Sequence, residues 1–145
     1  IEVYRLGGVS GPPGWNVLIT PGPRFDLHAP DADLAAYVVI VYATEDAPPE
    51  REAVVRLVRG IGAPPSILLS EQPDGALYGS ADVGPDRVFA ACAVRTDPRA
   101  VAVAVVRLVN KRSAGKAAYE SAGGQSLLCR IAASVTLTER RHVYE

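Results

Sequence analysis

One segment constrains the fold more than any other, because all seven residues of Tyr37–Ala43 are apolar or aromatic. A strand without a polar position has no face that can be left in water, so it is typical of the centre of a sheet that is covered on both sides. The segment Arg87–Arg95 holds a second apolar run, Val88–Val94, between two arginines. The sequence therefore predicts two buried strands and elements that cover both of their faces.

Turn signals divide most of the remaining chain. We predict further strands at residues 1–6, 15–20, 66–70 and 76–81, where apolar residues lie between clusters of Gly and Pro. Gln72–Gly75 contains Pro followed by Asp-Gly, which predicts a tight turn. A helix is predicted to follow the acidic, Pro-containing segment Thr44–Glu50 and to run to about Gly60.

The C-terminal half is more ambiguous. Thr96, Asp97 and Pro98 are typical of a helix start, so we expect a helix over residues 99–112, although the alternation of Ala and Val also fits a strand. Residues 116–121 predict a short helix. Residues 125–138 predict one long strand, or a helical turn followed by a strand. The whole pattern predicts an α/β or α+β fold: a single compact domain, residues 1–145, with a mixed β-sheet of about six to seven strands covered by two to three helices.

Charge and hydropathy exclude several classes of protein. The 145 residues are 48% hydrophobic, which is enough for one domain with a substantial core. The net charge of -1 gives no field for general binding to nucleic acid or to an anionic membrane. No apolar stretch approaches the roughly 20 residues of a membrane span. We therefore expect a cytoplasmic protein with no nucleic-acid and no membrane partner.

The two cysteines each lie in an apolar run. Cys92 follows Ala90 and Ala91, and Cys129 follows Leu127 and Leu128. Thiols in such surroundings usually behave as small buried apolar groups. We expect two reduced core thiols, with a disulfide between them as the alternative.

The C-terminal tail is the first candidate site. If residues 139–145 continue a strand, Arg140, His142 and Tyr144 share one face. A guanidinium, an imidazole and a phenol can together hold an anionic substrate. The hypothesis assigns catalysis to Glu139 and His142 and substrate binding to Arg130, Arg141 and Tyr144. The alternative is a solvated terminal strand.

A basic stretch with a glycine, residues 110–116, is the second candidate. Lys111, Arg112 and Lys116 lie around Gly115, and backbone N–H groups at such a turn can cradle a phosphate or carboxylate. These three residues join the substrate-binding hypothesis. The alternative is a helix C-terminus, where cations are favourable.

No metal or cofactor is expected. Asp26, His28, Asp31 and Asp33 lie close in sequence, but their spacing matches no metal motif, and a solvated polar loop accounts for them. The sequence also lacks the common nucleophile, zinc and dinucleotide motifs.

Two functions are compatible with these observations. The first is a non-enzymatic oligomerising or regulatory domain in a larger complex, whose partner is a second copy or a larger protein. The alternative is a small oligomeric enzyme that binds an anionic metabolite, a carboxylate or a phosphate, at a subunit interface.

Overall fold

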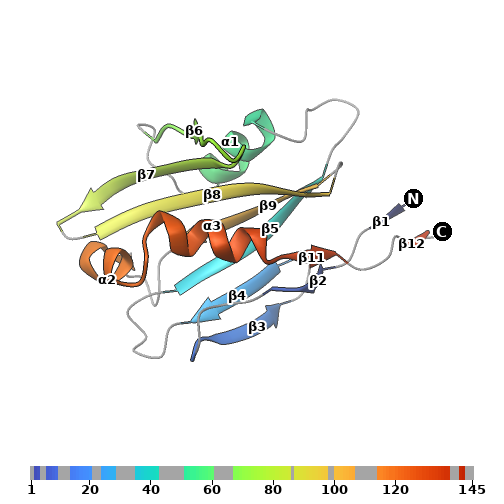
Figure 1. The fold of residues 1–145 in the computed structure, drawn as a ribbon, viewed down its shortest axis with the longest axis horizontal. Helices are drawn as coiled ribbons and strands as arrows, with labels where there is room; N and C mark the ends of the chain where they lie inside the picture. The colour runs from blue at the N-terminus through green and yellow to red at the C-terminus, as the bar shows by residue number, and fades with distance from the viewer. Residues whose placement is uncertain are drawn as a thin grey trace.

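The computed structural model describes residues 2–3, 6–9, 14–20, 24–28, 35–42, 51–60, 67–85, 87–97, 100–106, 114–137 and 141–142. Its centre is an antiparallel sheet in the order β3-β4-β5-β9-β8-β7-β6, with β10 also paired to β8 (Figure 1). The strands of this sheet are β3 (Asn16–Thr20), β4 (Arg24–His28), β5 (Ala35–Tyr42), β6 (Ser70–Glu71), β7 (Leu77–Gly84), β8 (Arg87–Asp97), β9 (Ala100–Val106) and β10 (Ala114–Gly115).

Helices lie on both faces of the sheet. They are α1 (Arg51–Gly60), α2 (Lys116–Ser121) and α3 (Gln125–Ala133). Two short strand pairs lie apart from the main sheet: β1 (Glu2–Val3) pairs with β12 (Arg141–His142), and β2 (Leu6–Gly8) pairs with β11 (Thr136–Leu137). The predicted α+β fold class is confirmed. Every strand pair among the described residues is antiparallel, although a mixed sheet was expected.

The two apolar runs form β5 and β8, two buried strands of one sheet on either side of β9, and the prediction that they are buried is confirmed. Alternate residues of β5 point to opposite faces, so Val38 packs in the cluster under α3 while Tyr37 packs in the cluster under α1. In β8, Cys92 and Ala91 divide between the same two clusters. Both strands are therefore covered on both faces, which explains their uninterrupted apolar sequence.

The helix predicted over residues 99–112 is wrong, because residues 100–106 form β9 between β5 and β8. The alternation of Ala and Val follows the two faces of the sheet. Val101, Val103 and Val105 lie under α1, whereas Ala102 and Ala104 lie under α3. The alanines that suggested a helix instead keep the surface below α3 flat, so that this helix can lie close to the sheet.

Of the two alternatives for residues 125–138, the long strand is wrong, whereas a helical turn followed by a strand is close to the structure. Residues 125–133 form α3, and only Thr136–Leu137 are a strand. The buried positions of the helix are Leu127, Leu128, Ile131 and Ala132, which repeat with the spacing of one helix face. The strand-forming residues after Ala133 had obscured this helical spacing.

Smaller expectations divide between confirmed and corrected ones. The helix ending at Gly60 and the short helix over residues 116–121 are confirmed. The turn at residues 72–75 is confirmed too, with the Gln72 N–H donating to the Ala76 carbonyl at 2.7 Å and Gly75 at a φ of 89°. The strand predicted at 66–70 is limited to Ser70–Glu71, and β4 had not been expected.

The expectation of two reduced thiols is wrong, because Cys92 and Cys129 form a disulfide with a Cα–Cα distance of 5.4 Å. The bond joins the centre of β8 to the middle of α3. The side chain of Cys92 is fully buried, and that of Cys129 is partly exposed. Cys92 lies in the sheet and Cys129 lies in the helix that covers it. Both belong to the same apolar cluster.

In the part of the chain that the structure describes, no helix is both long enough and apolar enough to cross a membrane.

Candidate functional site

The tail residues do not gather into a described site. Arg141 and His142 lie on β12, opposite Val3 and Glu2 of β1. Glu139 and Tyr144 lie outside the described residues. Arg130 is exposed on α3, where its guanidinium donates to the Ser126 hydroxyl at 3.1 Å. The substrate-binding and catalytic roles of these residues stay predictions.

The described residues of the basic stretch belong to two elements, a short strand and the start of a helix. Lys111 and Arg112 lie outside the described residues, whereas Ala114–Gly115 form β10. Lys116 is the first residue of α2. The alternative interpretation had placed this residue at the C-terminus of a helix, which is wrong. The ammonium of Lys116 forms an ion pair with Asp82, at 3.2 Å from the nearer carboxylate oxygen. This exposed pair ties α2 to β7.

Only two of the four residues in the group Asp26, His28, Asp31 and Asp33 are described by the structure. Asp26 and His28 lie two residues apart on β4, and Asp31 and Asp33 lie outside the described residues. Among the residues that the structure describes, no three His, Cys, Asp or Glu side chains are grouped as metal ligands.

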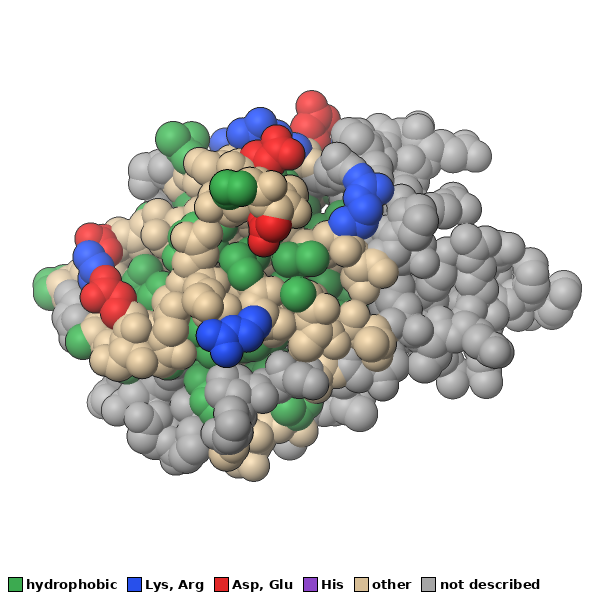
Figure 2. Space-filling view, viewed as in Figure 1, with side chains coloured by type: hydrophobic (Ala, Val, Ile, Leu, Met, Phe, Trp, Pro, Cys, Tyr) green, Lys and Arg blue, Asp and Glu red, His purple; other side chains and the backbone are tan. Residues whose placement is uncertain are grey.

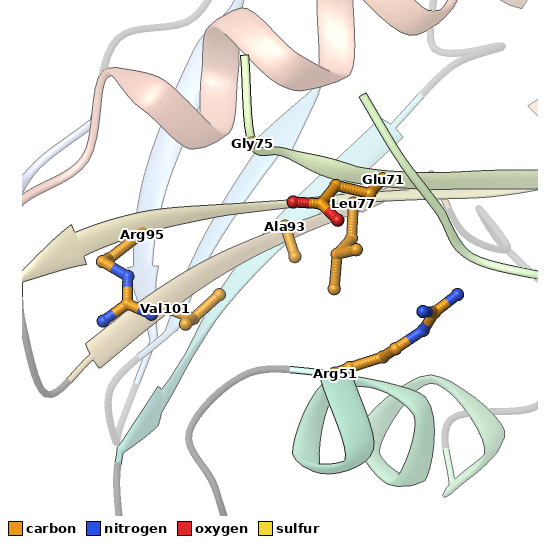
Figure 3. A pocket seen from close by; sticks show the side chains of 7 residues that line it. All are labelled: Arg51, Glu71, Gly75, Leu77, Ala93, Arg95 and Val101. Atoms are coloured by element: carbon orange, nitrogen blue, oxygen red, sulfur yellow. The ribbon is translucent and has the colours of Figure 1, made fainter. Parts of the chain in front are cut away.

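A pocket that the sequence did not predict lies between α1 and one end of the sheet (Figure 3). It holds about 350 Å³. We call it the α1 pocket, and seven residues from four strands, one turn and one helix line it: Arg51, Glu71, Gly75, Leu77, Ala93, Arg95 and Val101.

The register of the sheet builds the floor of the α1 pocket. Glu71 lies opposite Leu77, and Leu77 lies opposite Ala93, so these three residues form one row across β6, β7 and β8. Arg95 lies two residues beyond Ala93 on the same face, opposite Val101. The pairing irregularity that follows Arg95 marks the end of regular pairing between β8 and β9. The floor is therefore apolar, with a charged side chain at two of its borders.

Arg51 closes the pocket from the opposite layer. It is the first residue of α1, and its guanidinium donates to the Leu69 carbonyl at 3.0 Å. This bond anchors the start of the helix over the segment that leads into β6. A guanidinium has five N–H donors, so one such bond does not exhaust its capacity for a ligand.

The arrangement of charge gives the pocket its chemistry. Two guanidiniums and one carboxylate give its lining a net charge of +1. In Figure 3, Arg51 and Arg95 lie at opposite ends, with Glu71 and Leu77 between them. Guanidinium groups pair well with carboxylates and phosphates, and an apolar floor beside them suits an aliphatic or aromatic body.

A second hollow lies on the other face of the sheet. It is a shallow groove between the β6–β7 turn and α3, lined by Gln72, Pro73, Asp74, Gln125, Ser126, Cys129, Arg130 and Ala133. We call it the α3 groove. A hydrogen bond of 2.9 Å joins the side-chain amides of Gln125 and Gln72 beside it. Charged side chains of both signs are scattered over the described part of this face (Figure 2), so no one sign of charge dominates it.

A pair of tyrosines, Tyr119 of α2 and Tyr78 of β7, joins these two elements on the same face. The hydroxyls of Tyr78 and Tyr119 are 2.7 Å apart, and Tyr119 is 4% exposed. Burial raises the pKa of Tyr119 above its ordinary value, and the hydrogen bond with Tyr78 raises it further. A phenol that holds its proton so firmly is a structural hydrogen-bonding group rather than a base near neutral pH.

The sequence had given only a weak signal for the α1 pocket. Arg95 ends the apolar run of β8, and a charged residue at the end of a buried strand is a reasonable candidate for a site. No role had been assigned to Arg51 or to Glu71 from the sequence. Nothing in the sequence shows that these three residues meet, because the register of β6, β7, β8 and β9 brings them together.

Comparison with family models, curated proteins and solved structures finds no match.

Proposed function

We propose that this domain binds a small anionic ligand in the α1 pocket, with a carboxylate held by Arg95, one of the two arginines at opposite ends of the apolar floor. The observation that carries the proposal is the placement of two guanidiniums at the ends of one hollow of about 350 Å³. That volume is at the small end of the range for ligand sites, so a metabolite rather than a polymer is the expected occupant.

The ligand is an anion, as expected from the sequence, but the residues proposed to bind it are different. The earlier candidates lay on the tail and at residues 111–116, whereas the α1 pocket lies at the β6–β9 end of the sheet. Both buried floor residues, Ala93 and Val101, are 4% exposed, so they form a firm base for a ligand. The proposed role is binding, and the catalytic roles of Glu139 and His142 are not needed for it.

Isothermal titration calorimetry with 3-methylbutanoate tests this function. The wild-type protein should bind, and Arg95→Gln should weaken binding by about tenfold or more through the loss of a charged hydrogen bond. Arg59→Gln is the matched control, because Arg59 is an exposed arginine of α1 outside the pocket lining. Equal binding by all three proteins, or no binding by the wild type, contradicts the proposal.

Self-association is the second candidate function, and one observation favours it. β3 is an edge strand that pairs only with β4 among the described strands, and its Val17 is 39% exposed. Open edges of this kind can pair with a second copy. Light scattering should then show a dimer that Val17→Lys converts to a monomer. A wild-type monomer at high concentration contradicts this candidate.

The disulfide bears on the compartment. A cytoplasmic protein had been expected, but stable disulfides are typical of oxidising compartments. We therefore propose that the chain folds where thiols are oxidised. Protein isolated from its source with immediate alkylation should then contain no free thiol at Cys92 or Cys129, and two alkylated cysteines contradict this proposal.

A further inference from the structure

The two cysteines of the disulfide lie in very different surroundings. Cys92 is at the centre of β8, where it is fully buried in the apolar cluster under α3. Cys129 is partly exposed on α3 and is one of the residues that line the α3 groove. A disulfide is opened by a thiolate that reaches one of its two sulfurs, so access decides which sulfur is attacked. The groove therefore gives a thiol from solution access to the Cys129 end of the bond.

The α3 groove has room and polar partners for a small thiol compound. It holds about 630 Å³, which is within the range of small-ligand sites. Its lining contains the guanidinium of Arg130, the carboxylate of Asp74 and the side-chain amides of Gln72 and Gln125. A peptide thiol such as glutathione has amide groups and charges of both signs, which are the groups that such a lining can bind.

We propose that Cys129 is a thiol-exchange site, at which a small peptide thiol in the α3 groove opens the Cys92–Cys129 disulfide. The thiolate of the incoming compound attacks Cys129 Sγ and forms a new S–S bond with it, while the bond to Cys92 breaks. The electron pair of the broken bond stays on Cys92 Sγ, which takes up the proton that the incoming thiol has lost.

A second small thiol completes the reduction. Its thiolate attacks the sulfur of the compound bound to Cys129, forms a disulfide with it and releases Cys129 as a thiolate, which then takes up the second proton. The protein disulfide thereby gains two electrons and two protons, and two small thiols become one small disulfide. The reaction needs no other oxidant or reductant.

This site is separate from the proposed anion site. The α3 groove and the α1 pocket share no lining residue, and they lie on opposite faces of the sheet. The same exchange in reverse also provides a route to the disulfide in an oxidising compartment. A small disulfide first reacts with the thiolate of Cys129, and Cys92 then displaces the small thiol and closes the bond.

A variant that fills the groove tests the route of attack. Ala133 is an exposed residue of the groove lining one helical turn after Cys129, so a larger side chain there leans back over Cys129. Ala133→Phe should slow the opening of the oxidised disulfide by reduced glutathione about tenfold, as measured by acid quenching, alkylation and mass spectrometry. Ala122→Phe is the matched control, because Ala122 is exposed but outside the groove lining. Equal rates in both variants and in the wild type overturn the proposal.

Two single-cysteine variants test which sulfur reacts. In Cys92→Ala the thiol of Cys129 should take up one glutathione from oxidised glutathione. In Cys129→Ala the thiol of Cys92 should react about tenfold more slowly or less, because it is buried under α3. Both variants should react at the same rate when they are unfolded in urea, which shows that the difference comes from the fold. Equal rates in the folded variants, or a faster reaction at Cys92, overturn the proposal and leave the anion site in the α1 pocket unaffected.

Discussion

The two faces of the sheet are covered in different ways. On one face, α2 and α3 pack over a continuous cluster and are tied down by the Cys92–Cys129 disulfide. A hydrogen bond of 3.0 Å from Thr96 to the Val135 carbonyl adds a second tie after the end of α3. On the other face, α1 contributes two fully buried valines and leaves the α1 pocket beside its first residue.

The two faces therefore differ in the residues that lie between the sheet and its helices. Small residues under α3 let that helix lie close to the sheet. The valines under α1 fill the centre of the other face, and a charged border remains at the end where the helix begins. Loss of packing should therefore be most costly on the α3 face, and loss of charge should matter only on the α1 face.

The largest effect is expected from cavities under the two helices. Ile131→Ala should lower the free energy of unfolding by about 2–5 kcal/mol, because Ile131 is 1% exposed under α3. Val58→Ala, also 1% exposed but under α1, removes fewer carbons and should cost about 2 kcal/mol. Urea denaturation measures both values. A larger loss of unfolding free energy in Val58→Ala than in Ile131→Ala would contradict this difference between the two faces.

Removal of the disulfide should have the next largest effect. The bond closes a loop with a sequence separation of 37 residues, so the double variant Cys92→Ala, Cys129→Ala should lose about 2–4 kcal/mol. Thermal unfolding of the variant and of the oxidised wild type gives the difference. Binding of 3-methylbutanoate in the α1 pocket should persist in the folded variant. A lost site with an intact fold would show that the two faces are coupled.

A close approach at the edge of the sheet predicts a moderate effect. Gly79 of β7 is buried, and a Cβ there would collide with the Leu68 carbonyl oxygen and lie 2.9 Å from Leu69 Cδ2. Gly79→Ala should therefore cost about 1–3 kcal/mol of stability and shift the segment that leads into Glu71. Gly60→Ala is the control, since nothing lies within 4 Å of its Cβ position. Equal stability of the two variants would contradict this packing.

The smallest effect is expected at the tyrosine pair. Tyr119→Phe removes the hydrogen bond with Tyr78 and should cost about 1 kcal/mol. The pKa of Tyr119 is raised in the folded state, so its phenol holds a proton more tightly there than in the unfolded chain. This contribution is complete below about pH 10 and is lost as the pH rises further. Stability measured between pH 9 and 11 should fall less steeply in Tyr119→Phe than in the wild type, and parallel curves would contradict this assignment.

The strands and helices that follow local rules were predictable. An uninterrupted apolar run predicts β5, and a Pro-Asp-Gly signal predicts the turn before β7. The error at β9 arose because Ala favours helices in isolation, whereas the alternation of Ala and Val reflected two faces of a sheet. Local propensity cannot show which of these two constraints prevails before the neighbouring strands are known.

The disulfide and the α1 pocket depend on tertiary structure. Cys92 and Cys129 become neighbours only when α3 packs on β8, and the sequence left residues 125–138 open between a long strand and a helical turn followed by a strand. Arg51, Glu71 and Arg95 likewise meet through the register of three strands and the docking of α1. The residue types in the sequence could indicate an anionic ligand. Only the tertiary structure shows which residues lie close enough to form a pocket for it.

We expect the α1 pocket, and not the α3 face, to bind a small carboxylate. A titration of ¹⁵N-labelled protein with 3-methylbutanoate, followed by amide chemical shifts, tests this expectation. Saturable shifts should appear at Gly75, Leu77, Ala93, Arg95 and Val101, with Leu128 and Ile131 of α3 unchanged. Shifts confined to the α3 groove, or none at saturating ligand, would contradict it.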